Sequence, residues 1–257
     1  MHMRVLVFGA AGRMGQEICS AVEADVGLEL CGAVDPNRHD GKQSDNSVVT
    51  AKTIRDIDPS TIDVAIDFTV AEAARENIAW CANNGVHAVV GTSGLNNDDQ
   101  ELFATLFSQS NCLLAPNFDI GAVLMMRFAE ISAPFFPTAE IIELHHDNKV
   151  DAPSGTAMQT LERMSLASEE WGADPTLNEI VTGARGGKGP GGISVHSVRM
   201  RGLVAHQEVM LGTEGETLTI RHDSLDRSSF MGGILHACKV IGEFPGVTVG
   251  LDRYLGL

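Results

Sequence analysis

The sequence predicts an α/β fold whose first part is a parallel β-sheet covered by helices and whose second part is α+β. Two observations support this fold class. Short apolar runs alternate with helical stretches up to Phe118, which is typical of a parallel sheet. Beyond Phe118 the pattern changes, and several strand-like segments follow one another, which indicates a separate domain.

The first apolar run, residues 5–8, leads into a glycine turn and then into a helical pattern. Glycines at such a turn let the backbone approach a pyrophosphate, which sits at the helix N-terminus. The spacing is G-x-x-G-x-x-G rather than the common G-x-G-x-x-G, so the turn alone also fits an ordinary connection. The candidate contacts in it are Gly9, Ala10, Ala11, Gly12, Arg13 and Met14.

A second apolar run, residues 28–34, ends in Asp35, twenty residues after Gly15. In a dinucleotide-binding domain an acidic residue at this point normally accepts hydrogen bonds from the adenosine ribose. The glycine turn and Asp35 together predict a Rossmann-type domain. A nucleotide-sensing protein without catalytic activity would share both features, and so would a different oxidoreductase of the same fold.

Three further apolar runs, residues 64–66, 87–90 and 112–114, each lead into a loop, with helical stretches at 71–83 and 98–108 between them. Ligands bind at the carboxyl ends of the strands in open α/β sheets. These loops are therefore either cofactor contacts or ordinary connections. The candidate contacts in them are Phe68, Thr69, Gly91, Thr92, Ser93, Ala115, Pro116, Asn117 and Phe118.

The second part begins with a strongly helical stretch, residues 121–133, in which we expect Met125, Met126 and Phe128 to lie in the core. Strand-like segments follow at residues 139–144, 193–200, 207–211 and 217–222. They predict an α+β domain with a mainly open mixed sheet. We expect the glycine-rich segment 183–192 to be a mobile loop, either a lid or a surface loop without a role.

The most informative stretch is residues 143–157, where proton donors, a cation and a helix start crowd together. His145, His146 and Lys149 follow the predicted strand, and Ser154 precedes the helical pattern. The amide groups of the helix start would face a bound carboxylate, so the stretch suits a polyanionic substrate. Surface histidines and a simple helix cap are the alternatives. A metal site is disfavoured, because no cysteine lies at a familiar ligand spacing.

This stretch resembles the signature of the dihydrodipicolinate reductases, also called 4-hydroxy-tetrahydrodipicolinate reductases, residue by residue. The loops after the three apolar runs resemble the nicotinamide-side loops of the same family. The resemblance covers nearly the whole chain and is closest to actinobacterial members. It implies reduction of the cyclic dicarboxylate 4-hydroxy-tetrahydrodipicolinate, with loss of water and hydride addition at ring C4, in diaminopimelate and lysine biosynthesis.

The resemblance also assigns roles to individual residues. It makes His145 the acid/base and Lys149 a proton donor, with His146, Gly155 and Thr156 as substrate ligands. It implies NADH or NADPH as the cofactor and a homotetramer as the assembly, with pairing of the second domain's sheet. It further implies that the C-terminal stretch, a helix over residues 228–242 and the apolar run 247–249, returns to the first domain.

The expected domain boundaries follow from these patterns. Residues 1–117 and 229–257 are expected to bind the dinucleotide, and residues 118–228 to bind the substrate and to form the oligomer. Family members often carry a basic residue directly after the acid, where it takes a 2′-phosphate. Here Pro36 and Asn37 intervene before Arg38, so we expect NADH to be used at least as well as NADPH. Arg13 is either a phosphate contact or a solvated residue.

Composition agrees with a globular enzyme of two domains. The chain has 257 residues, a hydrophobic content of 44% and a formal net charge of −16. Such an acidic chain is a poor partner for nucleic acid or for an anionic membrane. No apolar run approaches the ~20 residues of a membrane span, and no signal peptide is visible, so we expect a cytoplasmic protein. Its five cysteines contain no CxxC pair, which disfavours a disulfide framework.

Overall fold

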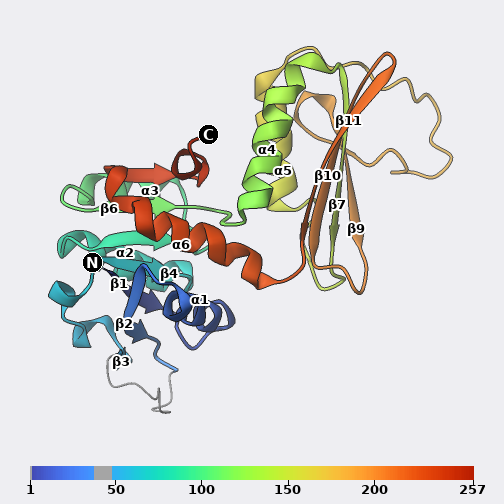
Figure 1. The fold of residues 1–257 in the computed structure, drawn as a ribbon. Coiled ribbons are helices and arrows are strands. Elements are labelled where there is room, and N and C mark those ends of the chain that lie inside the picture. The colour runs from blue at the N-terminus through green and yellow to red at the C-terminus, as the bar shows by residue number, and fades with distance from the viewer. Residues whose placement is uncertain (1, 38–47) are drawn as a thin grey trace. The chain divides into compact units, whose positions relative to one another are not determined.

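The computed structural model describes residues 2–37 and 48–257, and the chain divides into two compact units. The first unit comprises Met1–Phe118 and Phe230–Leu257, and the second comprises Asp119–Ser229 (Figure 1). Among the described residues, no helix is both long and apolar enough to span a bilayer.

The first unit contains a parallel sheet of seven strands in the order β12-β6-β5-β4-β1-β2-β3. The strand order reverses beside β1, whose neighbours are β2 and β4, and such a reversal is where dinucleotides bind in open α/β sheets. The strands are β1 (Met3–Phe8), β2 (Leu28–Val34), β3 (Val49–Ala51), β4 (Val64–Asp67), β5 (His87–Val90), β6 (Asn111–Leu114) and β12 (Gly246–Val249).

Helices pack on this sheet and explain its apolar strands. Val5, Leu6 and Val7 of β1 are all fully buried, as expected for a strand covered on both faces. The helix α1 contacts α6, and α2 contacts α3. Their bounds are α1 (Arg13–Ala24), α2 (Ala71–Asn83), α3 (Asn97–Leu106) and α6 (Met231–Val240). Short 3₁₀ turns complete the unit at η1 (Ile54–Asp56), η2 (Pro59–Thr61), η6 (Ile241–Glu243) and η7 (Asp252–Leu255).

The C-terminal stretch returns to the first unit, as the resemblance implied. β12 pairs in parallel with β6, from Gly246 opposite Asn111 to Val249 opposite Leu114. The Asn111 side chain reinforces this edge, since its Nδ2 donates to Ile241 O at 2.8 Å and its Oδ1 accepts from Gly246 N at 3.1 Å.

The second unit contains a mixed sheet of five strands in the order β11-β10-β7-β9-β8. The β7–β9 pair is parallel and the other pairs are antiparallel, which confirms the predicted mixed sheet. Its strands are β7 (Thr138–His145), β8 (Gly187–Lys188), β9 (Ser194–Arg199), β10 (Ala205–Thr213) and β11 (Glu216–Ser224). The helical elements are α4 (Ile120–Ser132), η3 (Ala133–Phe135), α5 (Gly155–Ala167), η4 (Pro190–Gly192) and η5 (Arg227–Phe230).

Two expectations for this unit were wrong. The segment 183–192 is not loop throughout, because Gly187 and Lys188 form the edge strand β8 against β9. An edge strand pairs on one side only, so a glycine-rich stretch can form it. Phe128 is 49% exposed, whereas Met125 and Met126 of the same helix are buried. The turn of the α-helix places Phe128 beside the buried stripe rather than within it.

Candidate active site

The glycine turn between β1 and α1 brings the helix directly against the strand end. Gly9 has φ +72°, and a Cβ at Gly15 would lie 2.1 Å from Gly9 O, so a side chain there would displace the helix. Gly12 is the N-cap of α1 and makes no side-chain cap hydrogen bond. The turn therefore has the close backbone packing and the open helix N-terminus that a pyrophosphate requires.

Asp35 lies beside this turn, at the carboxyl end of β2. Its carboxylate accepts hydrogen bonds from Ala11 N at 3.1 Å and from Asn37 N at 2.8 Å. Asp35 is 7% exposed and lines a pocket of about 510 Å³. The pocket combines apolar walls, such as Phe8 and Val34, with this acidic group, so it fits the adenosine half of a dinucleotide.

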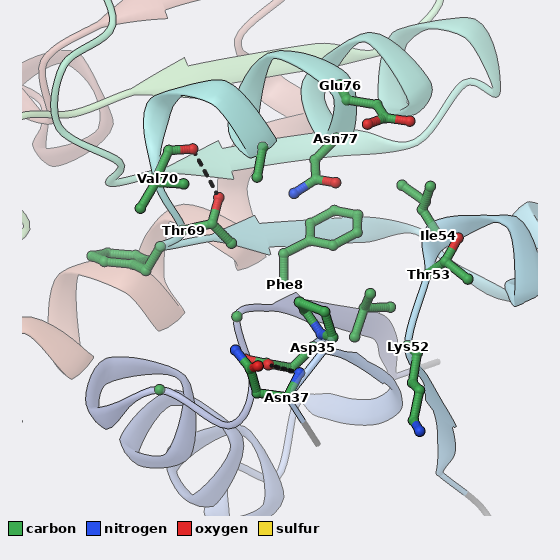
Figure 2. Close-up of a pocket in the computed structure, with 16 residues that line it drawn as sticks. Phe8, Asp35, Asn37, Lys52, Thr53, Ile54, Thr69, Val70, Glu76 and Asn77 are labelled. Carbon is green, nitrogen blue, oxygen red and sulfur yellow. Dashed lines mark hydrogen bonds between the residues drawn. The ribbon is translucent and has the colours of Figure 1, made fainter. Parts of the chain in front are cut away.

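Figure 2 shows the walls of this pocket, which come from loops at the carboxyl ends of neighbouring strands and from helix α2. Asp35 and Asn37 face Thr69 and Asn77 across it. Lys52, directly after β3, lines a third side. The sequence reasoning missed Lys52, because the three residues of β3 are too few to give a recognisable apolar run. Arg38, the cation considered from the sequence, lies outside the described residues.

A buried carboxylate, Asp67, holds two of the predicted cofactor loops together. Asp67 is 2% exposed, and its Oδ1 accepts hydrogen bonds from Thr69 N at 2.9 Å, Thr69 Oγ1 at 2.7 Å and Thr92 Oγ1 at 2.7 Å. Its Oδ2 accepts from Asn77 Nδ2 at 2.7 Å. The Asp67 carboxylate therefore fixes the loops after β4 and β5 to each other. No sequence pattern indicates this role beyond a carboxylate at a strand end.

Aromatic contacts join the same loops to the loop after β6. The rings of Phe68 and Phe118 lie 5.5 Å apart between centroids. A Cβ at Gly91 would lie 2.2 Å from the Phe68 ring, so glycine is required for the ring to lie there. Of the predicted cofactor residues, Gly9, Gly12, Asp35, Phe68 and Thr69 line the pocket. The others lie outside the pocket lining, in the turn after β1 (Ala10, Ala11), at the start of α1 (Arg13, Met14), in the loop after β5 (Gly91, Thr92, Ser93) and in the loop after β6 (Ala115, Pro116, Asn117, Phe118).

In the second unit, His145 is the last residue of β7 and is held by a buried ion pair. Its Nδ1 lies 2.5 Å from Glu143 Oε2, and Arg199 of β9 binds both oxygens of Glu143, at 2.8 and 2.7 Å. Burial alone would raise the pKa of Glu143, but hydrogen bonds from Arg199, Ser197 and His145 lower it overall. Burial lowers the pKa of His145, and the neighbouring Glu143 carboxylate only partly offsets this. The surroundings of His145 thus favour the neutral form of its ring.

The other predicted substrate residues lie in the loop after β7 and in the first turn of α5. Lys149 Nζ donates to Asp151 Oδ1 at 2.8 Å, and His146 is exposed. Ser154 is the N-cap of α5, and its hydroxyl accepts from Ala157 N at 3.2 Å. A Cβ at Gly155 would meet nothing within 4 Å, so the space over this helix start is open. The loop and the helix start present a cation and backbone amides, which suits an anionic ligand.

The family is decided by matches over both units. Residues 3–118 match the model described as "Dihydrodipicolinate reductase, N-terminus", and residues 121–255 match the model described as "Dihydrodipicolinate reductase, C-terminus". The chain belongs to the dihydrodipicolinate reductase family. Relatives named 4-hydroxy-tetrahydrodipicolinate reductase include those of Cutibacterium acnes, 47% identical over 99% of both chains, and Nocardia farcinica, 46% identical over 100% of both.

Solved structures agree with this membership. The family member from Paenisporosarcina sp. TG-14, described as dipicolinate bound, superposes with a TM-score of 0.90 at 35% identity. The match covers 98% of this reductase and 99% of that chain. The amine dehydrogenase of Mycobacterium smegmatis matches with a TM-score of 0.66 at 15% identity, which shows a shared fold alone.

Proposed function

We propose that this reductase converts 4-hydroxy-tetrahydrodipicolinate into tetrahydrodipicolinate, with loss of water and hydride addition at ring C4, in diaminopimelate and lysine biosynthesis. The family match over both units supports this reaction. The observation that carries it is the arrangement at the end of β7, where a partly buried, oriented histidine is followed by a lysine and an open helix start. A proton-transfer group beside a site for carboxylates is what reduction of an unsaturated dicarboxylate requires.

NADH or NADPH supplies the hydride when it is bound to the first unit, residues 1–117 with 229–257. Gly9, Gly12 and the N-terminus of α1 would hold the pyrophosphate, and Asp35 the adenosine ribose. The loops after β4, β5 and β6 would hold the nicotinamide. Their fixed geometry around Asp67 supports this assignment, because a preorganised loop loses little conformational freedom when the cofactor binds.

The second unit, residues 118–228, would bind the substrate. Lys149, His146 and the amides of Gly155 and Thr156 would pair with its carboxylates. Hydride addition to the conjugated C=C–C=N system pushes negative charge onto the ring, and a proton must neutralise it. Lys149 is the cation that would deliver this proton, and His145 would deliver one through Nε2 after that nitrogen has itself taken up a proton.

We infer that the reductase acts in the cytoplasm as a homotetramer that contacts neither nucleic acid nor membrane. Its acidic net charge of −16 supports the last two statements. The five-stranded sheet of the second unit supports self-association, since its strands β11 and β8 are edges that need cover. Light scattering at micromolar concentration tests the assembly, and a stable monomer would contradict it without affecting the catalytic proposal.

Turnover tests the reaction. A synthase generates the unstable substrate in the cuvette, and the loss of nicotinamide absorbance follows the reduction. A panel of amino acids and semialdehydes separates the proposal from other dehydrogenases that share the fold. Oxidation of NADH or NADPH with a panel compound, but not with the cyclic dicarboxylate, would contradict the proposed substrate. Cofactor binding without any turnover would indicate a nucleotide sensor.

A further inference from the structure

The Glu143 side chain is fully buried, and its two oxygens accept several hydrogen bonds, including one from the Ser197 side chain. Oε2 accepts from His145 Nδ1 at 2.5 Å and from Arg199 Nη1 at 2.8 Å. Oε1 accepts from Arg199 Nη2 at 2.7 Å and from Ser154 N at 3.2 Å. One carboxylate thus contacts the end of β7, a residue of β9 and the residue that caps α5.

The bond to His145 determines which ring nitrogen carries the proton. An ionised carboxylate can only accept hydrogen bonds, so Nδ1 of a neutral His145 must be the protonated nitrogen. Nε2 is then the unprotonated nitrogen that remains for proton exchange outside this pair. Without the carboxylate, the neutral ring would be free to adopt either tautomer and to rotate about its side-chain torsions.

Arg199 keeps this carboxylate from acting as a simple counter-ion for a histidine cation. Its guanidinium binds Glu143 through two bonds, and in the parallel pairing of β7 and β9 it lies opposite His145. The charged groups that act on the His145 ring are Glu143, Arg199 and Lys149, and Lys149 is itself paired with Asp151. The buried pair is neutral as a whole and favours a neutral ring.

The bond to Ser154 links the histidine to the helix start. Ser154 N donates to the same carboxylate, and its hydroxyl caps α5 through Ala157 N. Arg199 adds a bond of 2.6 Å to Asp151 O, in the loop that precedes the helix. One buried group, the Glu143 carboxylate, therefore positions both the His145 ring and the amides of Gly155 and Thr156.

We propose that Glu143 is a positioning residue for the proposed reaction. It fixes the Nδ1-protonated tautomer of His145 and the first turn of α5, and Arg199 balances its charge. The proposal rests on the proposed function, since it gives His145 its role as the acid/base. It differs from a purely structural ion pair, which would change the stability of the protein without selecting a tautomer.

The test is the variant Glu143→Gln, which keeps the shape of the side chain but replaces one acceptor oxygen by a donor. We expect kcat to fall at least tenfold, because a misplaced His145 would lose much of its contribution as an acid/base. KM and the Kd for NADH should change less than about threefold. In protein labelled with ¹⁵N-histidine, the NMR signals that disappear in His145→Gln identify His145. They should show a protonated Nδ1 in the native protein and lose that signature in Glu143→Gln.

A matched control is available on the same strand. Glu140 also contacts a histidine and an arginine, His196 at 2.6 Å and Arg185, but it lies an odd number of residues from Glu143 and so faces the other side of the sheet. Glu140→Gln should keep kcat within about twofold of the native value and leave the His145 signals in place. This separates loss of a carboxylate that contacts a histidine and an arginine on β7 from loss of the His145 contact itself.

Glu143→Gln leaves the Arg199 cation unpaired, which can prevent folding. The double variant Glu143→Gln with Arg199→Gln removes both charges and gives the same readouts. A folded variant that keeps the Nδ1-protonated His145, or that keeps kcat within about twofold of native, would overturn the proposal. The NMR measurement needs no substrate, so its result stands apart from the proposed function, which fails only if the native protein does not turn over the dicarboxylate.

Discussion

Asp67 and Thr92 join two neighbouring loops through a hydrogen bond of 2.7 Å from the threonine hydroxyl to the buried carboxylate. Thr69 binds the same carboxylate oxygen through its amide and its hydroxyl. The loops after β4 and β5 are thus fixed before any cofactor arrives. Because the carboxylate is buried and charged, each lost donor would weaken its stabilisation.

Thr92→Val should weaken cofactor binding. The variant keeps the shape of the side chain and removes the donor, so we expect a Kd for NADH about tenfold higher and a stability loss of about 1–3 kcal/mol. Fluorescence titration and thermal unfolding measure the two effects. Thr105→Val is the control, since Thr105 Oγ1 donates to Leu102 O on an exposed helix. An unchanged Kd in Thr92→Val would remove these loops from the cofactor site.

His145→Gln and Lys149→Ala should each lower kcat by roughly a hundredfold or more, because both groups act on the substrate ring in the proposed reaction. The Kd for NADH should stay near the native value in both variants, since neither residue belongs to the dinucleotide unit. Steady-state kinetics and equilibrium titration give the two quantities. Parallel loss of cofactor affinity in both variants would contradict the assignment.

Pyridine-2,6-dicarboxylate, a flat analogue of the proposed substrate, should compete with the substrate. We expect it to bind more tightly once the reduced cofactor is present, and more weakly in Thr156→Val than in the native protein. Calorimetric titration with and without NADH measures this coupling. If the analogue does not bind under either condition, the proposed class of substrate is wrong.

The residues after β2 predict the choice of cofactor. Asp35 suits the ribose hydroxyls of NADH, whereas the 2′-phosphate of NADPH would meet like charge. Lys52 lines the same pocket and offers a compensating cation. We therefore expect kcat/KM for the two cofactors to differ by less than about tenfold, or roughly 1.4 kcal/mol.

Two variants test this explanation of cofactor choice. Pro36→Arg should shift the ratio of kcat/KM towards NADPH by adding a phosphate partner. Lys52→Ala should shift it towards NADH, and the same shift should appear in the Kd of 2′,5′-ADP relative to 5′-AMP. A hundredfold native preference for NADPH would contradict the role given to Asp35.

The sequence predicted the elements whose pattern is local. The helix α2 has the predicted bounds, and His145 lies where its strand was expected to end, because apolar periodicity and strand-end chemistry are properties of short windows. The partners of buried polar groups cannot be predicted in this way, because they are distant in the sequence. Arg199 lies 56 residues from Glu143, and only the pairing of β7 with β9 brings the two together. The exposure of Phe128 was not predicted either, because the sequence pattern of an apolar residue beside the buried stripe of a helix is the same as that of a residue within the stripe.

The atom that receives the hydride identifies the reaction. The reductase is incubated with NADH that carries deuterium at both C4 positions and with the cyclic dicarboxylate made in place by a synthase. NMR and mass spectrometry of the product then locate the label. The proposed reaction predicts one deuterium at ring C4 of tetrahydrodipicolinate for each NADH oxidised. A product without deuterium, or with deuterium at another carbon, would contradict it.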